Sequence, residues 1–137
     1  MLVLANLRAD RRANAAVEFA LGLPVLLLAT LMVIDLGRSL LAYTAVNNLA
    51  AEGVRYAAVR GAESPTAADI SAIESYVVSR GAGLNAENLS VAVTYDATNA
   101  TGNAVEVTVR YDMTLFLNPI FDFADFTITG KSRMTVL

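Results

Sequence analysis

The first third of the chain is dominated by one long run of apolar positions. From Phe19 to Ile34 no residue carries a charge, and extending the run back to Asn14 adds only Glu18. At 1.5 Å per helical residue, residues 14–34 span about 31 Å, enough to cross a hydrocarbon core of about 30 Å. No small-x-small cleavage site follows the run. The pattern therefore predicts a transmembrane helix over 14–34 rather than a cleaved secretory signal.

The helical pattern continues beyond the apolar run. Residues 35–60 contain no proline and are rich in alanine, leucine and arginine, which favour helices. One face recurs at three- and four-residue steps: Leu36, Leu40, Tyr43, Asn47, Ala50, Val54 and Ala57. We therefore expect a single helix over 14–60, about 70 Å long, standing mostly clear of its own domain and packing on a partner through small residues. Pro24 is expected to kink it.

The segment 61–137 predicts a small domain. Gly61–Pro65 breaks the helix, and a new helix begins at Ser64-Pro65 or Thr66, with Asp69 in capping-box position. Its apolar stripe is Ile70, Ile73 and Val77, with Tyr76 beside it, and it ends near residues 81–83.

Beyond Asn88 the period changes from helical to alternating. Three strands are predicted, over 89–95, 105–115 and about 126–136, separated by a turn-rich loop at 96–103 and an apolar connection at 116–125. The expected inward positions are Leu89, Val91, Val93, Tyr95, Val105, Val107, Val109, Tyr111, Met113, Leu115, Ile128, Met134 and Val136. The fold class is therefore α+β: a long amino-terminal helix, then one helix covering a three-stranded antiparallel sheet.

The connection 116–125 is unusually apolar for a loop, with Phe116, Ile120, Phe121 and Phe123 close together. Two interpretations are open. The loop folds over the sheet edge to complete a small core, or it is an exposed contact patch for another subunit or the membrane surface.

Charge is distributed unevenly along the chain. Residues 1–17 carry Arg8, Arg11 and Arg12 against Asp10, whereas residues 35–137 carry seven basic and eleven acidic side chains, within a total of −3. Basic flanks mark the cytoplasmic side of a membrane helix, so we expect residues 1–13 to be a cytoplasmic leader and 61–137 an exported domain. A mildly acidic domain without a basic stripe argues against a nucleic-acid partner.

Candidate chemistry is sparse. The chain has no histidine and no cysteine, which excludes imidazole catalysis, the usual zinc sites and disulfides. The acidic pairs Asp122/Asp125 and Glu106/Asp112 fit solvated surface positions better than an acid/base pair. The group Asp96, Asn99, Asn103 and Glu106 lacks the spacing of a calcium loop and fits a turn. We expect neither an enzyme nor a metal or other cofactor.

The basic-then-apolar amino end carries a family resemblance. The segment NAAVEFALGLP at 14–24, preceded by Arg11-Arg12, resembles the processing region of prepilin-like proteins. More specifically, residues 11–59 resemble the TadE-like family, small pseudopilins of Tad (Flp-type) pilus systems. The matching residues are Ala16–Leu21, Leu23-Pro24, Asp35–Arg38, Asn47–Ala50 and Glu52–Val59, and residues 131–136 are similar to the family's closing strand.

The resemblance implies a pilin-like fold and a bacterial inner-membrane location with the carboxyl domain in the periplasm. It also implies cleavage by a prepilin-type peptidase at the Ala13–Asn14 bond, five residues ahead of Phe19. Glu18 then becomes the fifth residue of the mature chain. Family members generally have glycine before the cut, where this chain has Ala13. The implied partners are other pilin or pseudopilin subunits, the peptidase and membrane lipid.

Several residues are candidate assembly contacts, each with a simpler alternative. Glu18 pairs with a neighbouring subunit's new α-amino group, or it snorkels to the interface. Asp35 and Arg38 form an intrahelical pair, or they contact another subunit. Asn47 and Asn48 hydrogen-bond to a partner helix, or they face solvent. These and Pro24 make up the predicted assembly contacts.

Two rival functions remain open at this level. The first is an unprocessed single-pass component of the same secretion machinery, which Ala13 makes plausible. The second is a membrane-tethered periplasmic binding module, which would need a concave site within 84–137.

Overall fold

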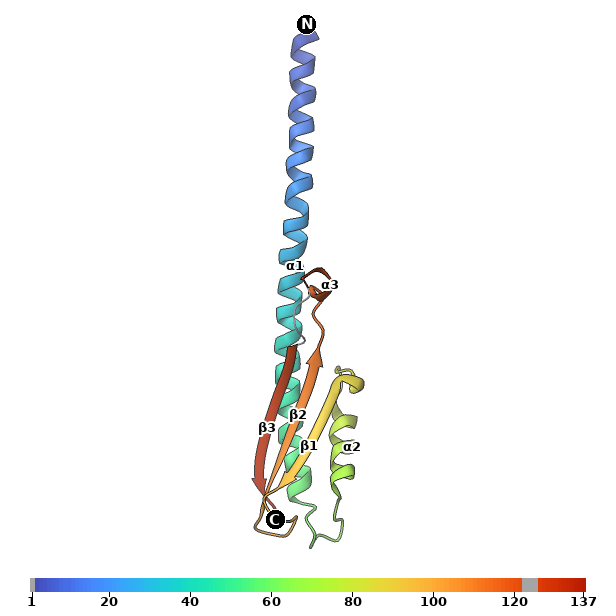
Figure 1. The fold of residues 1–137 in the computed structure, drawn as a ribbon, viewed down its shortest axis with the longest axis vertical. Coiled ribbons are helices and arrows are strands. Elements are labelled where there is room, and N and C mark those ends of the chain that lie inside the picture. Colours follow the sequence, from blue (N-terminus) through green and yellow to red (C-terminus); the bar gives the residue numbers. More distant parts are fainter. Residues whose placement is uncertain (1, 122–125) are drawn as a thin grey trace.

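The computed structural model describes residues 2–121 and 126–137, without the side chains of 2–10 and 12. One long helix carries a small α+β domain at its carboxyl end (Figure 1). The elements are α1 (Leu2–Ala58), α2 (Ile70–Arg80), the short 3-10 helix η1 (Ala86–Asn88), β1 (Leu89–Tyr95), β2 (Ala104–Met113), α3 (Asn118–Phe121) and β3 (Phe126–Thr135). The α+β class predicted from the sequence is confirmed.

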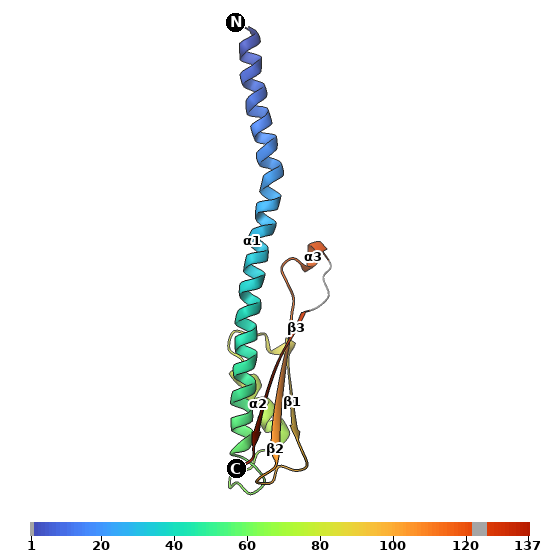
Figure 2. The ribbon, with the colours of Figure 1, turned by 90° about the vertical axis from the view of Figure 1, so that its left-hand side faces the viewer.

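The helix α1 is longer at its amino end than the sequence pattern predicted. It begins at Leu2, so the basic leader and the apolar run belong to one helix, and it ends two residues before the predicted Arg60. It continues through Pro24 without interruption and curves only gently (Figure 2). One proline removes a single ladder hydrogen bond, and the turns on either side hold the helix together.

The sheet is an antiparallel meander with strand order β1-β2-β3, as predicted. In its register Val93 lies opposite Val107, and Val107 lies opposite Ser132. Most inward positions on the central strand are fully buried, including Val105, Val107 and Val109. Met134, predicted to point inward, is 39% exposed. It lies on β3, which has a neighbouring strand on one side only.

The carboxyl-terminal third of α1 forms the core of the domain, together with the sheet. Its buried face consists of Ala42, Val46, Leu49, Ala50, Val54, Ala57 and Ala58. The approach is close: a Cβ added at Gly130 of β3 would lie 2.8 Å from the backbone oxygen of Val46, and one at Gly53 of α1 would lie 2.6 Å from Val77 Cγ2. The small residues of α1 therefore serve packing within the molecule.

Two predictions for α1 are thereby corrected. Leu36, Leu40 and Tyr43, expected on its packing face, are exposed, whereas Ala50, Val54 and Ala57 are buried as expected. The helix also stands clear of its domain only in its amino-terminal part. The first difference arises because the sheet packs on a face rotated away from the predicted stripe. The second arises because the buried residues of α1 from Ala42 to Ala58 belong to the core of the domain.

The helix α2 begins later than predicted. Asp69 is its N-cap and accepts a 2.8 Å hydrogen bond from the backbone N–H of Ala72, so it is not the N3 residue of a capping box that starts at Thr66. Residues 64–68 form turns instead, in which Ala68 N–H donates to the carbonyl of Arg60. Ile73 and Val77 are buried as expected, whereas Ile70 is exposed.

Candidate functional site

The predicted processing residues all lie on the exposed amino-terminal part of α1. Ala13, Asn14, Glu18 and Phe19 are exposed, and the Ala13–Asn14 bond lies inside the helix. Glu18 has no hydrogen-bond or ion-pair partner among the side chains that the structure describes. Pro24 is exposed on the same segment. All five residues are exposed, so the described part of the domain does not cover them.

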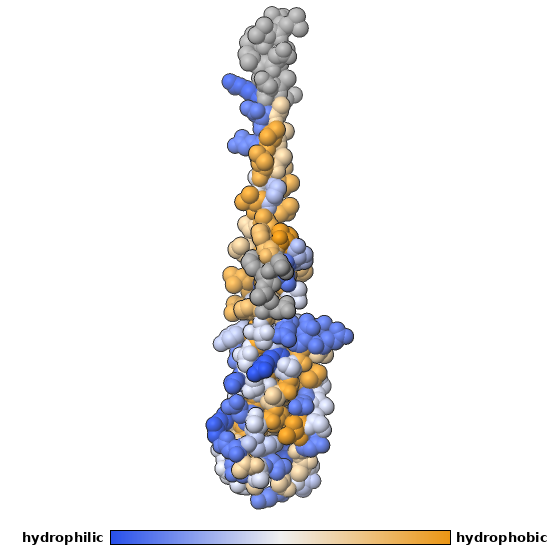
Figure 3. Space-filling model, in the orientation of Figure 1, coloured by the Kyte–Doolittle hydropathy of each residue, from blue (hydrophilic) through white to orange (hydrophobic). Residues whose placement is uncertain are grey.

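This segment has the character of a membrane span. From Ala13 onward α1 is long and apolar enough to cross a bilayer, and the most apolar stretch has no part buried inside the molecule. Figure 3 shows the contrast between this apolar shaft and the mixed, largely polar surface of the domain. An apolar surface of this size, left uncovered, is consistent with a membrane anchor.

Asp35 is the most elaborate polar centre of the described part of the chain. It lies one residue after the apolar run and is only 5% exposed. Its Oδ1 accepts the backbone N–H of Phe116 at 3.0 Å, and its Oδ2 accepts that of Leu117 at 3.2 Å. A carboxylate that accepts two backbone hydrogen bonds is a strong tether. Asp35 therefore fastens the loop after β2 to the helix.

Arg38 completes this centre. Its Nη1 lies 3.4 Å from Asp35 Oδ1, which is the intrahelical pair that the spacing predicted. Its guanidinium also lies over the ring of Phe116, 4.3 Å from the centroid. The helix thus holds the loop through both a carboxylate and a cation–π contact. No pattern in the sequence predicts these loop contacts, because the partners lie about eighty positions apart.

Asn47 and Asn48 differ in their surroundings. The amide of Asn47 donates to the carbonyl of Tyr43, one turn earlier in the same helix, at 2.8 Å. Asn48 is exposed. Both amides leave hydrogen-bonding capacity for a partner, and that role stays a prediction.

The connection after β2 has both an anchored and an exposed part. Leu117 is buried, whereas Phe116, Ile120, Phe121 and Phe126 are 49–56% exposed. We call these four residues the apolar tip. Residues 122–125, including Phe123, Asp122 and Asp125, lie outside the described residues. The described part favours the second interpretation of this loop, an exposed contact patch, over a loop folded into the core.

A layered aromatic cluster joins α1 to α2, and sequence reasoning missed it. The rings of Tyr56 and Tyr76 stack with centroids 3.9 Å apart. The Tyr76 hydroxyl donates to Glu52 Oε1 at 2.9 Å, and Arg80 Nε lies 3.6 Å from the same oxygen. The hydrogen bond to the Glu52 carboxylate raises the pKa of Tyr76. Glu52 and Tyr56 therefore position α2 on the long helix.

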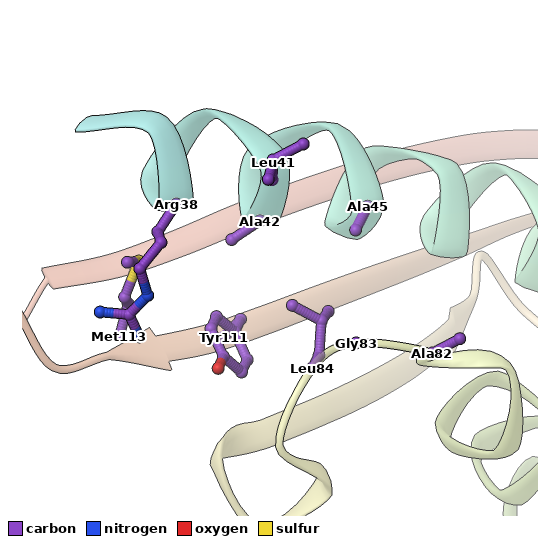
Figure 4. A pocket seen from close by; sticks show the side chains of 9 residues that line it. All are labelled: Arg38, Leu41, Ala42, Ala45, Ala82, Gly83, Leu84, Tyr111 and Met113. Atoms are coloured by element: carbon purple, nitrogen blue, oxygen red, sulfur yellow. The ribbon is translucent and has the colours of Figure 1, made fainter. Parts of the chain in front are cut away.

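A shallow groove of about 380 Å³ opens beside this core, between α1, β2 and the turn after α2 (Figure 4). Its polar side chains are Arg38 and Tyr111; the other lining residues are Leu41, Ala42, Ala45, Ala82, Gly83, Leu84 and Met113. A small-ligand site normally has several converging polar groups. This groove offers few, so it gives little support to the binding-module alternative.

The acidic candidates for chemistry have structural partners. Glu106 lies 3.7 Å from Lys131 Nζ, and Asp112 accepts a 2.7 Å hydrogen bond from the Thr127 hydroxyl. Asp96 pairs with Arg133 across the end of the sheet. Within residues 2–121 and 126–137 no three histidine, cysteine or acidic side chains gather as a metal site would require.

Comparison with known proteins bears on the helix. Residues 14–55 match the family model described as TadE-like protein, which covers the apolar run and most of the domain-packing part of α1. No curated protein and no solved structure gives a significant match. The family match suggests a role in Tad pilus systems. Over residues 14–55 the chain is therefore similar to the TadE-like family, as its sequence resemblance predicted.

Proposed function

We propose that the protein is a minor pseudopilin of a Tad-type pilus system, anchored in the inner membrane by residues 14–34 and acting through assembly. The observation that carries the proposal is α1 itself. A single helix joins an uncovered apolar shaft to the packed core of the domain. Such a subunit transmits the packing of its shaft directly to the position of its domain. It turns over no substrate.

The charge distribution supports one orientation. Arg8, Arg11 and Arg12 precede the span, and the acidic domain follows it. By the positive-inside rule the amino end is cytoplasmic and the domain periplasmic. The partners are then lipid and other pilin-type subunits along the shaft, and a prepilin-type peptidase at the cytoplasmic boundary.

Processing at Ala13–Asn14 requires a change in the helix. The bond lies within α1, where the backbone amide groups are bonded to one another. Asn14 lies about three helical turns from Leu2, so the leader turns of α1 have to unwind locally before the bond can reach a peptidase. The cut leaves Asn14 as a new α-amino group with an ordinary pKa of about 7.7–8.0.

Glu18 is the proposed partner of that amine on a neighbouring subunit. Its side chain is exposed and has no partner among the described side chains, although a carboxylate within a bilayer is costly. Pairing with a cation offsets part of this cost. The glutamate would thereby select the axial offset at which two subunits pack.

The test is Glu18→Gln, with Glu87→Gln as the matched control on the exposed surface of the domain. We expect Glu18→Gln to be cleaved but to co-purify poorly with the pilus apparatus, whereas Glu87→Gln behaves as the wild type. Unchanged cleavage and unchanged incorporation of Glu18→Gln would refute the pairing role. An intact amino terminus in the wild-type chain would instead support the unprocessed membrane component.

A further inference from the structure

We propose that the apolar tip, formed by Phe116, Ile120, Phe121 and Phe126, is a second membrane contact that inserts into the interface of the outer leaflet. The occupant of this surface is lipid at the boundary of headgroups and acyl chains. The inference rests on the proposed membrane span of α1, and it adds a contact made by the domain itself.

The first argument is the level of the tip along α1. The loop is fastened through the backbone of Phe116 and Leu117 to Asp35, and Asp35 directly follows the last residue of the apolar run, Ile34. Both ribbon views show α3 beyond the end of the sheet, at the height of the middle of α1 rather than of its domain end (Figures 1 and 2). The tip therefore lies at the depth where the helix leaves the bilayer.

The burial pattern of the helix agrees with this level. Between residues 13 and 34 every side chain is exposed except Leu28 and Leu31, which are half-buried. Both lie on the face of Asp35, at spacings of seven and four residues. The side of the helix that receives the loop thus continues into the last two turns of the apolar run.

The second argument is the chemistry of the exposed surface. The four tip residues are about half exposed, and they add to exposed apolar positions on α1 on both sides of Asp35, including Met32, Val33, Leu36, Leu40 and Leu41. Exposed apolar side chains of both the loop and α1 are therefore present near Asp35, where the apolar shaft ends. Phenylalanine and large aliphatic side chains are typical of protein surfaces that are buried at the boundary of headgroups and acyl chains.

The third argument is that the charged groups near the end of the apolar run have partners within the protein. Asp35 and Arg38 are the charged residues between Phe19 and Ala51. Asp35 turns inward to two loop amides, and Arg38 lies over Phe116. Irregular backbone near lipid requires such internal partners. The flexible aliphatic stem of Arg38 also allows its guanidinium group to reach the phosphates of the lipid headgroups.

These contacts give the domain two points of attachment. A single spanning helix leaves the domain free to rotate about the helix axis, whereas a tip that projects from the axis fixes one side of the domain toward the membrane. The subunit would then present a defined face to its neighbours before assembly. Entry into a filament would require the tip to leave the lipid.

The experiment uses the absence of tryptophan from the chain. Three single-tryptophan variants of the full chain, Ile120→Trp, Val25→Trp and Leu137→Trp, are reconstituted in phosphatidylcholine vesicles with and without bromine on the acyl chains. All three sites are exposed. Val25 reports on the proposed span, and Leu137 lies at the far end of the domain. Circular dichroism checks that each variant keeps the fold.

We expect brominated lipid to quench Val25→Trp strongly, Ile120→Trp at least about half as much, and Leu137→Trp hardly at all. Quenching at residue 25 with none at residue 120 would overturn this inference and leave the membrane anchor standing. No quenching at residue 25 would overturn the anchor. If Ile120→Trp were shielded from aqueous acrylamide but not quenched by lipid, a protein would cover the tip, and the inference would also be wrong.

Discussion

Replacing Asp35 with alanine tests the connection on which the position of the apolar tip depends. The change removes the acceptor of two backbone N–H groups, those of Phe116 and Leu117, and leaves Arg38 without its ion pair. A hydrogen bond to a charged group contributes about 1.5–3 kcal/mol. The two bonds share one carboxylate, and in the variant the two N–H groups can partly bind water instead. We therefore expect the loop contact to lose about 2–4 kcal/mol of free energy rather than the full sum.

The loss of stability should affect the loop at residues 116 and 117 more than the rest of the domain. The loop is attached to α1 mainly through Asp35, whereas the sheet is stabilised by the buried valines of β2. Hydrogen exchange of the full chain in detergent micelles measures the opening of each amide. At about 1.4 kcal/mol for each factor of ten, amides 116 and 117 of Asp35→Ala should exchange about 30- to 1,000-fold faster, and those of β2 should change far less.

Two controls separate the carboxylate from other effects. Arg38→Ala removes a partly exposed ion pair and one ring contact, so the two amides should change by less than about 1 kcal/mol. Asp112→Ala makes the same chemical change at an exposed position whose partner is the Thr127 hydroxyl, and it should leave residues 116 and 117 unaffected. The reasoning is wrong if Asp35→Ala folds and protects both amides within about threefold of the wild type.

Two further predictions concern the domain. Gly130→Ala brings a Cβ to 2.8 Å from the backbone oxygen of Val46 and should lower the free energy of unfolding, measured with denaturant, by about 1–3 kcal/mol. In the control Gly37→Ala the new Cβ meets no atom within 4 Å, and the variant should gain up to about 1 kcal/mol of helix stability. Equal effects of the two substitutions would contradict the close approach of α1 and β3. The hydrogen bond to Glu52 raises the pKa of Tyr76, so the stability it contributes is present below pH 10 and is lost as the pH rises through the folded pKa. Tyr76→Phe should reduce that alkaline loss in a thermal unfolding series, and an unchanged pH profile would argue against the bond.

The elements of this fold follow from local pattern, whereas the site depends on contacts that local pattern does not encode. Alternation identified β1 and β2, and the uncharged run identified the exposed shaft. The packing face of α1 was harder to predict from the sequence. Leu36 and Leu40 are as apolar as Val46, and in a helix that meets lipid, domain and solvent in turn, hydrophobicity alone does not say which face meets which.

Asp35 is a second example of contacts that the sequence pattern does not predict. Its spacing to Arg38 predicted the intrahelical pair, but the two stronger contacts go to backbone amides of residues 116 and 117. Backbone amides carry no side-chain identity, so no pattern in the sequence marks them as partners. The same holds for Gly130, whose importance comes from the approach of Val46 on another element.

The central claim, a processed pilin-type subunit, is tested most directly by the mass of the mature chain. The protein is purified from membranes of cells with and without the prepilin-type peptidase, and its intact mass and amino-terminal residue are determined. We predict an amino terminus at Asn14 when the peptidase is present and at Met1 when it is absent. A chain that begins at Met1 in both strains would contradict the claim and identify the protein as an unprocessed membrane component.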